Sequence, residues 1–249
     1  MEYQEHYSQN DPTLLDFNRR LIKAKKIASV ISDFTKINPD TCIFLDIGCS
    51  AGINTVYFGT LVKESVGIEF DSEAVKIGNA QKNKNVTLLI GDAIHLPFKD
   101  EIFEVVICNH IYEHVPDAQI LMDEVYRILK PGGICYFGAT NRFCFIEPHY
   151  QLPFLSWLPK PIANCYLSVL HRKTPYYENL RSYYGIRALF SGFSVKEYTV
   201  EIIRNPDRFN AGDIVKEGSI FRYIPKVIWI VLMPIIPTYI FVLSKSKKD

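Results

Sequence analysis

The sequence predicts an α/β protein built on a doubly wound, mostly parallel sheet. β-prone runs occur in order at residues 42–45, 65–70, 86–93, 103–110 and 134–140. Segments with helical periodicity at residues 72–82 and 117–130 stand between these runs. Strands that alternate with helices require parallel crossovers and therefore a doubly wound sheet. No glycine- or serine-rich linker divides the 249 residues, so we expect one domain over residues 1–249.

Two helices have clear sequence signals. In residues 117–130, apolar side chains recur at the spacing of one buried face, Asp117 is placed to cap the first turn, and Lys130-Pro131-Gly132 is placed to end the helix. Residues 13–37, before the first strand, form a second predicted helix. We interpret its basic residues as a solvated face: Arg19, Arg20, Lys23, Lys25 and Lys26.

The turn after the first strand carries the clearest functional signal. Here Asp46, Gly48 and Gly52 stand where a buried strand becomes a helix. Glycine allows a tight turn and lets a ligand approach where a Cβ would collide. Ligands of doubly wound sheets bind beyond the carboxyl ends of the strands, where Gly48, Glu69, Asp92 and Asn109 all fall. We therefore expect these residues to converge on one crevice.

This turn resembles the first motif of the class I S-adenosylmethionine (SAM) dependent methyltransferases, Asp-x-Gly-x-Gly-x-Gly, with Ser50 in place of the central glycine. Glu69 follows Gly48 by about twenty residues, the spacing at which a carboxylate meets a ribose diol. Asp92, in a Gly-Asp-Ala segment, looks like the family residue that reaches the adenine amino group. The resemblance implies SAM as cofactor, with these contacts: Asp46, Gly48, Cys49, Ser50, Gly52, Glu69, Phe70, Asp92, Ala93, Asn109 and His110.

The resemblance also implies the rest of the fold. It is a Rossmann-like sheet of seven strands, mostly parallel, with an antiparallel last strand at residues 238–244 and a sixth strand at 193–198. Residues 41–142 would form the SAM-binding core. Residues 1–40 would form an amino-terminal helix and a lid over the cofactor, with Tyr3, His6 and Tyr7 in the lid.

A nicotinamide-dependent oxidoreductase is the main alternative, because it shares the strand, the turn and the downstream acid. Its fingerprint needs glycine at positions 50 and 53, where this chain has Ser50 and Ile53. The sequence therefore favours a methyltransferase. A third class is a non-catalytic protein of the same fold that works at a membrane surface.

Two apolar insertions, residues 143–182 and 204–237, depart from the minimal family pattern. Their large apolar side chains predict a hydrophobic acceptor, such as a quinone, an isoprenoid or another lipid-linked molecule. Glu113-His114-Val115-Pro116 resembles a stretch of the quinone-biosynthesis branch of the family, where its role is largely in helix entry and in packing on the cofactor side. We therefore interpret His114 as structural.

Residues 225–233 predict a shallow interfacial helix at an anionic membrane surface. Trp229 would lie at headgroup depth, with Lys226 and Arg222 on the rim. The alternative is a helix packed on the sheet. A membrane span over residues 227–243 is disfavoured, because Pro234 and Pro237 would interrupt it and the run after them is needed as the last strand.

A hydroxyl or carbon acceptor must lose a proton during methyl transfer, which requires a nearby base. The candidate bases are His110, after the fourth strand, then Tyr112, Glu113 and His114, and then His149, at the mouth of the first insertion. Of these, His149 and His110 are the candidate catalytic residues. We expect His110 to be a cofactor contact first and a base second. A buried, hydrogen-bonded structural role is the alternative for His149.

Composition and charge limit the partners and the cellular location that we expect for the protein. The net charge is +1, which gives no argument for a nucleic-acid partner, and no metal-binding spacing is evident. The six cysteines include no Cys-x-x-Cys pair, and the polar start of the chain is unlike a signal peptide. These features predict a reduced cytoplasmic protein, peripheral on the membrane if residues 225–233 are interfacial.

Overall fold

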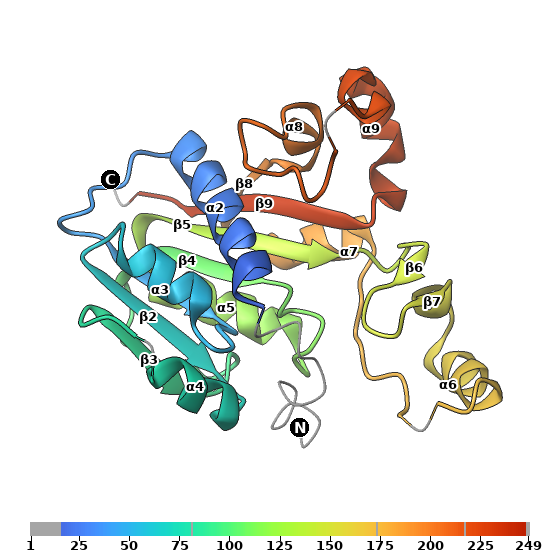
Figure 1. Ribbon diagram of the computed structural model, residues 1–249, viewed down its shortest axis with the longest axis horizontal. Helices are drawn as coiled ribbons and strands as arrows, with labels where there is room; N and C mark the ends of the chain where they lie inside the picture. Colours follow the sequence, from blue (N-terminus) through green and yellow to red (C-terminus); the bar gives the residue numbers. More distant parts are fainter. Residues whose placement is uncertain (1–15, 81, 173, 217, 248–249) are drawn as a thin grey trace.

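The computed structural model describes residues 16–80, 82–172, 174–216 and 218–247, and it has one seven-stranded sheet in the order β3-β2-β1-β4-β5-β9-β8 (Figure 1). Adjacent strands are parallel from β3 to β5, whereas β9 is antiparallel to both of its neighbours. The predicted fold class, including the antiparallel last strand, is confirmed. The predicted lid residues Tyr3, His6 and Tyr7 lie outside the described residues.

The strands of the sheet have these bounds: β1 Ile43–Ile47, β2 Glu64–Glu69, β3 Val86–Ile90, β4 Phe103–Asn109, β5 Leu129–Thr140, β8 Phe193–Glu197 and β9 Thr238–Lys245. The α-helices are α2 Phe17–Phe34, α3 Ile53–Gly59, α4 Ser72–Asn79, α5 Ala118–Ile128, α6 Lys160–Val169, α7 Tyr183–Arg187, α8 Thr199–Arg204 and α9 Lys226–Leu232. The Asp117 side chain accepts a hydrogen bond from the backbone N–H of Gln119, which confirms the predicted cap of α5.

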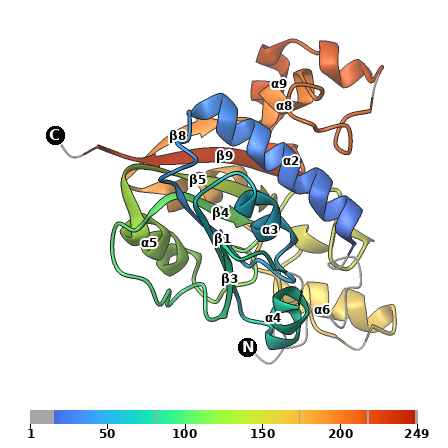
Figure 2. The same cartoon turned by 60° about the vertical axis from the view of Figure 1, so that its left-hand side comes forward.

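Helices cover both faces of the sheet, and each face has its own apolar core (Figures 1 and 2). The core on one face includes Ile27 and Val30 of α2 together with Phe58 of α3. The core on the other face includes Leu121 and Val125 of α5. Because strands buried on both faces read as continuous apolar runs, this layering explains the run before Asp46.

The two predicted insertions leave the sheet at the same end, because Thr140 at the end of β5 pairs with Thr238 at the start of β9. The first contains a short hairpin of β6 Ile146–Glu147 and β7 Leu152–Pro153, then a 3-10 turn, η2 Leu155–Trp157, and α6. The second contains η4 Ile220–Tyr223, α9 and η5 Met233–Ile235.

The predicted position of Trp229 was wrong. Trp229 is the buried residue of α9, at 8% exposure, and it packs into the core on the α5 face of the sheet. The exposed apolar side chains of this helix lie on its other sides: Val227, Ile228, Ile230 and Val231. Any interfacial contact of α9 therefore involves these aliphatic residues and not the tryptophan.

Among the described residues, the helices are too short or too polar to cross a bilayer. The run that could have extended α9 into a span is β9 instead, paired with β5 and β8.

Candidate functional site

A crevice of about 560 Å³ lies beyond the carboxyl ends of the parallel strands. It brings together these predicted cofactor contacts: Gly48, Ser50, Glu69, Phe70, Asp92, Ala93, Asn109 and His110. Both candidate catalytic histidines, His110 and His149, also line it. Three predicted contacts do not line the crevice: Asp46, which lies in β1, and Cys49 and Gly52, which belong to the loop between β1 and α3.

The loop between β1 and α3 has left-handed backbone at three positions, Gly48 (φ 70°), Ser50 (φ 52°) and Gly52 (φ 73°). Side chains disfavour this conformation, so the two glycines meet a backbone requirement. A Cβ on Gly48 would also stand 2.0 Å from Cδ1 of Ile111. The need for glycine at position 48 thus comes partly from packing against a neighbouring side chain.

Glu69 connects this loop to the end of β2. Its Oε2 accepts a hydrogen bond from the backbone N–H of Ser50 at 2.8 Å. Its Oε1 accepts from the backbone N–H groups of Phe70 (2.7 Å) and Asp71 (3.1 Å). The carboxylate is therefore held in place at the crevice wall.

Asp46 connects β1 to α3, the helix that follows the loop. Its side chain is 2% exposed, and its Oδ2 accepts a hydrogen bond from the Thr55 hydroxyl at 2.9 Å. Burial raises the pKa of Asp46 to about 7, against the lowering effect of the Thr55 hydroxyl and of Arg20. Asp92 is more exposed, and its Oδ1 accepts from the backbone N–H of Ile94 at 3.1 Å.

His110 directly follows β4 and lines the crevice. Its backbone is left-handed, with φ 59°. Nδ1 of His110 lies 3.0 Å from Oγ1 of Thr140 and 3.4 Å from Oε1 of Glu113. This places the imidazole between β4 and β5, with one edge lining the crevice.

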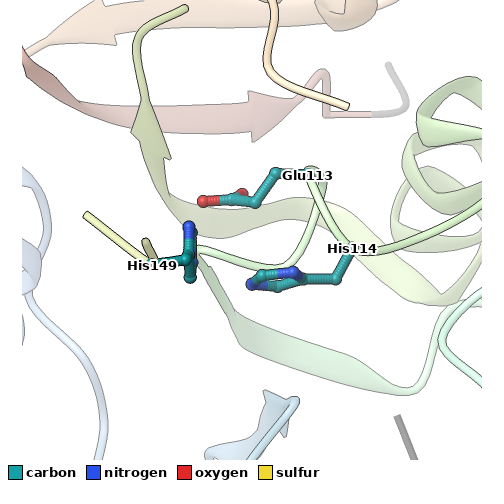
Figure 3. Close-up of side chains that lie close together, drawn as sticks. All are labelled: Glu113, His114 and His149. Atoms are coloured by element: carbon teal, nitrogen blue, oxygen red, sulfur yellow. The ribbon is translucent and has the colours of Figure 1, made fainter. Parts of the chain in front are cut away.

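His149 and His114 lie side by side at the wall of the crevice, with ring centroids 4.9 Å apart and planes near perpendicular (Figure 3). Each ring is held by a carboxylate. Nδ1 of His149 lies 2.8 Å from Oε1 of Glu147, and Nδ1 of His114 lies 2.8 Å from Oε2 of Glu178. Both carboxylates are buried.

Burial and mutual contacts shift the pKa values of three groups in and beside this cluster. Burial lowers the pKa of His149, but its hydrogen bond with Glu147 and the charge of Glu178 raise it to about 9. Burial opposes charge on His114 also, and the Glu178 hydrogen bond raises its pKa above the usual range. Burial would raise the pKa of Glu113, but His110 and His114 hold it below its usual range.

The interpretation of the basic residues of α2 as a solvated face was wrong for Lys26, which is 6% exposed and whose Nζ lies 2.7 Å from Oδ2 of Asp213. Arg19, Arg20 and Lys23 line the crevice, across from the loop. Thr140, Asp213 and Thr238 also line it, and sequence reasoning missed them. The helical period places Arg19, Arg20 and Lys23 close together on α2, which was an available signal. Asp213 lies in the second insertion, and no sequence pattern marked it.

The central part of the chain, residues 45–137, matches a family model described as a methyltransferase domain. A demethylmenaquinone methyltransferase from Staphylococcus carnosus is 32% identical over 122 residues, which are 46% of this chain and 51% of that protein. The chain thus spans about half the length of the curated relatives it matches.

Solved structures share the fold. A SAM-dependent methyltransferase from Methanosarcina mazei superposes with a TM-score of 0.57 at 15% identity, covering 88% of this chain and 98% of that one. Another, from Thermotoga maritima, superposes with a TM-score of 0.54 at 17% identity, covering 98% of this chain and 100% of that one. These likenesses confirm the Rossmann-like fold.

The residues of the crevice fit SAM. The crevice volume lies within the range of about 300–1,000 Å³ typical of small-molecule sites. Glu69 presents a fixed carboxylate, and Oγ of Ser50 is buried with no hydrogen-bond partner among the described residues. A ligand hydroxyl or amine placed beside Glu69 in the crevice would be in place to donate a hydrogen bond to its carboxylate. Residues 45–137 match a methyltransferase domain, and a fixed carboxylate at this place is of the kind that the ribose hydroxyls of SAM would meet.

Proposed function

We propose that this chain, which carries a class I SAM-dependent methyltransferase domain, transfers a methyl group to a hydrophobic acceptor of the quinone, isoprenoid or lipid-linked class. One observation carries the proposal. Pro148 and His149, from the first apolar insertion, line the same crevice as the cofactor residues Gly48 and Glu69. An acceptor bound by the insertion would therefore meet the cofactor directly.

The chemistry needs little beyond orientation. SAM, when bound, supplies an electrophilic methyl group on a sulfonium whose departure leaves a neutral thioether. The residues of this chain then act mainly by position, which can contribute several kcal/mol to the rate. Glu69 would accept hydrogen bonds from the ribose hydroxyls, and Asp92 from the adenine amino group.

A hydroxyl or carbon acceptor must give its proton to a base during methyl transfer. His110 and His149 line the crevice at its acceptor end, where a base is required for a hydroxyl or carbon acceptor. Their positions on two different segments, after β4 and in the first insertion, support the proposal that they flank the acceptor. His110 remains primarily a cofactor contact.

Exposed aromatic side chains near His149 support a hydrophobic acceptor. Phe145 and Phe154 stack edge to face at 4.5 Å, and Phe154 lies 5.1 Å from Trp157. All three are at least 40% exposed. Apolar surface of this kind is typical of ligand or membrane contact. We call these three residues the aromatic cluster.

The face of α9 that points away from the core, its outer face, also exposes apolar side chains, and this supports contact with an anionic membrane surface. Val227, Ile230 and Val231 are 60–75% exposed. Ile220 and Tyr223 of the adjoining η4 are exposed as well. We propose that this surface rests in the headgroup region, so that the chain takes its acceptor from the bilayer.

Turnover on a lipid extract tests the proposal. The full chain is incubated with SAM carrying a labelled methyl group, and the products are identified by mass spectrometry. We expect label in an apolar product, and loss of most of it with the Glu69→Ala variant. Calorimetric titration with SAM and with NADH runs in parallel. Binding of SAM without any labelled product would favour a non-catalytic role, and binding of NADH alone would favour an oxidoreductase.

A further inference from the structure

Three side chains at the acceptor end of the crevice have the composition of a metal site. One carboxylate oxygen of Glu113 and one nitrogen each of His114 and His149 all lie within 4.8 Å of one another. Figure 3 shows the three side chains gathered from two segments, with Glu113 and His114 on one and His149 on the other. Two histidines and one carboxylate are a frequent ligand set of catalytic zinc and of non-haem iron.

The surroundings of the two histidines match those of metal ligands. Histidines that bind a metal almost always give their other ring nitrogen to a carboxylate or carbonyl, which fixes the ring. Here Glu178 holds Nδ1 of His114 and Glu147 holds Nδ1 of His149, each at 2.8 Å. Glu178 and Glu147 are 2% and 0% exposed. Two separate carboxylate–histidine pairs thus converge on one point, which is the arrangement expected of carboxylates that orient metal-binding histidines.

Glu113 supplies an independent observation. Its side chain is fully buried, and neither carboxylate oxygen has a hydrogen bond of acceptable geometry among the described residues. Its nearest basic atom in an ion pair is Nδ1 of His110, at 3.4 Å. A buried carboxylate without a hydrogen bond is costly unless a cation compensates it. With Glu147 and Glu178, three buried carboxylates surround this point.

We propose that Glu113, His114 and His149 bind a divalent transition-metal ion of the Zn²⁺ type at the acceptor end of the crevice. Ligand atoms around tetrahedral zinc lie about 3.3 Å apart, given bonds near 2.0 Å, so the side chains must close inward to bind. Three protein ligands leave a coordination position open. His114 and His149 line the crevice, so that position is within reach of an acceptor oxygen.

This inference deepens the proposed methyl transfer and rests on it for its role. A bound divalent ion lowers the pKa of an oxygen ligand and so eases the loss of a hydroxyl proton. The acceptor would then be an oxygen nucleophile, for example a phenol or an enediol. His149 would act as a ligand and not as the base.

Metal binding is measured directly, without SAM or acceptor. The full chain, without an affinity tag, is stripped with a chelator and titrated with Zn²⁺ in a calorimeter, and the bound metal is counted by mass spectrometry. We expect about one Zn²⁺ per chain, and visible absorption bands when Co²⁺ is used instead. Zn²⁺ should also raise the Tm of the chain.

Variants separate the site from adventitious binding. His149→Asn and Glu113→Gln should each weaken Zn²⁺ binding by at least about 100-fold, and Glu178→Gln by about 10- to 100-fold, as is usual for outer partners of metal ligands. His171→Asn, at an exposed histidine outside the cluster, is the matched control and should bind like the wild type. Circular dichroism verifies the fold, and if Glu113→Gln does not fold, the partly exposed His149 carries the test.

Two results would overturn the inference. One is substoichiometric Zn²⁺ on the wild type with no Co²⁺ bands, which would leave the histidines as protonated partners of their carboxylates. The other is undiminished binding by His149→Asn. Neither result depends on turnover, so either one leaves the lipid-extract assay to decide the proposed function separately.

Discussion

Oε2 of Glu69 accepts a hydrogen bond at 2.8 Å from the backbone N–H of Ser50, so the acid at the end of β2 also organises the loop after β1. The loop after β1 and the end of β2 are thus one structural unit. A substitution at either residue should therefore disturb the position of the other. We expect the affinity for SAM to reveal this disturbance.

Glu69→Ala should weaken SAM binding by roughly 1.5–3 kcal/mol, the range for hydrogen bonds to a charged partner. The variant loses the ribose contact and also the hydrogen bond that positions Ser50. Calorimetric titration measures the change. Glu64→Ala, at the exposed other end of β2, is the matched control and should bind as the wild type does. An unchanged dissociation constant in folded Glu69→Ala would exclude the ribose assignment.

Ser50→Gly should stabilise the chain by roughly 1 kcal/mol, because Ser50 has a left-handed backbone that costs about this much for a residue with a side chain. SAM affinity should stay the same or improve modestly. Chemical denaturation and calorimetry measure the two effects. A tenfold loss of affinity without unfolding would show that the buried Ser50 hydroxyl is itself a cofactor ligand.

The stability of the ligand-free chain should depend on the protonation of Asp46. Because burial raises the folded-state pKa of Asp46 to about 7 from 3.8, the folded state binds more protons than the unfolded state between these values. The Asp46 contribution to the free energy of unfolding therefore falls as pH rises through this window. Relative to Asp46→Asn, the wild type should lose about 2–4 kcal/mol from pH 4 to pH 8.

Denaturant unfolding of both proteins at several pH values measures this difference. The Asn side chain does not titrate and can still accept the Thr55 hydrogen bond, so it is a close structural match. Parallel stability curves for the two proteins would contradict the burial argument.

Association with anionic liposomes should depend on the outer face of α9. The wild type should sediment with liposomes, and high salt should weaken this without abolishing it, because the contact is mostly apolar and only the exposed Lys226 is screened, whereas Arg222 is paired with Asp207. The triple variant with Val227, Ile230 and Val231 changed to serine should stay in solution and retain its SAM affinity. Trp229 is left intact because it is part of the core.

Wild type that does not associate with liposomes would remove the membrane from the proposed function. A triple variant that unfolds would show instead that the outer face of α9 contributes to the core. The aromatic cluster is unchanged in this variant, so acceptor turnover in detergent should persist.

The parallel core of the fold was predictable because its signals are local. Strand runs, the Asp117 cap and the glycine turn each lie within a few consecutive residues. The orientation of Trp229 was not predictable, because α9 is a seven-residue helix of almost uniformly apolar side chains, so no period marks its buried side.

The histidine cluster was hidden for a different reason. Glu178 meets His114 from 64 positions further along the chain, and only the packing of the first insertion brings them together. His114 was interpreted as structural because its own segment resembles a helix entry. The roles of the site residues stay predictions, although the crevice gathers most of them.

Both insertions join the sheet at Thr140 and Thr238, which pair with each other and line the crevice, whereas the loop with Gly48 and the end of β2 with Glu69 belong to other strands. The two insertions can therefore be exchanged at one place in the sheet. If the proposed function holds, a chimera that keeps β1 to β5 and β9 but takes residues 143–182 and 204–237 from a methyltransferase of the same fold would gain a new acceptor together with the old cofactor affinity.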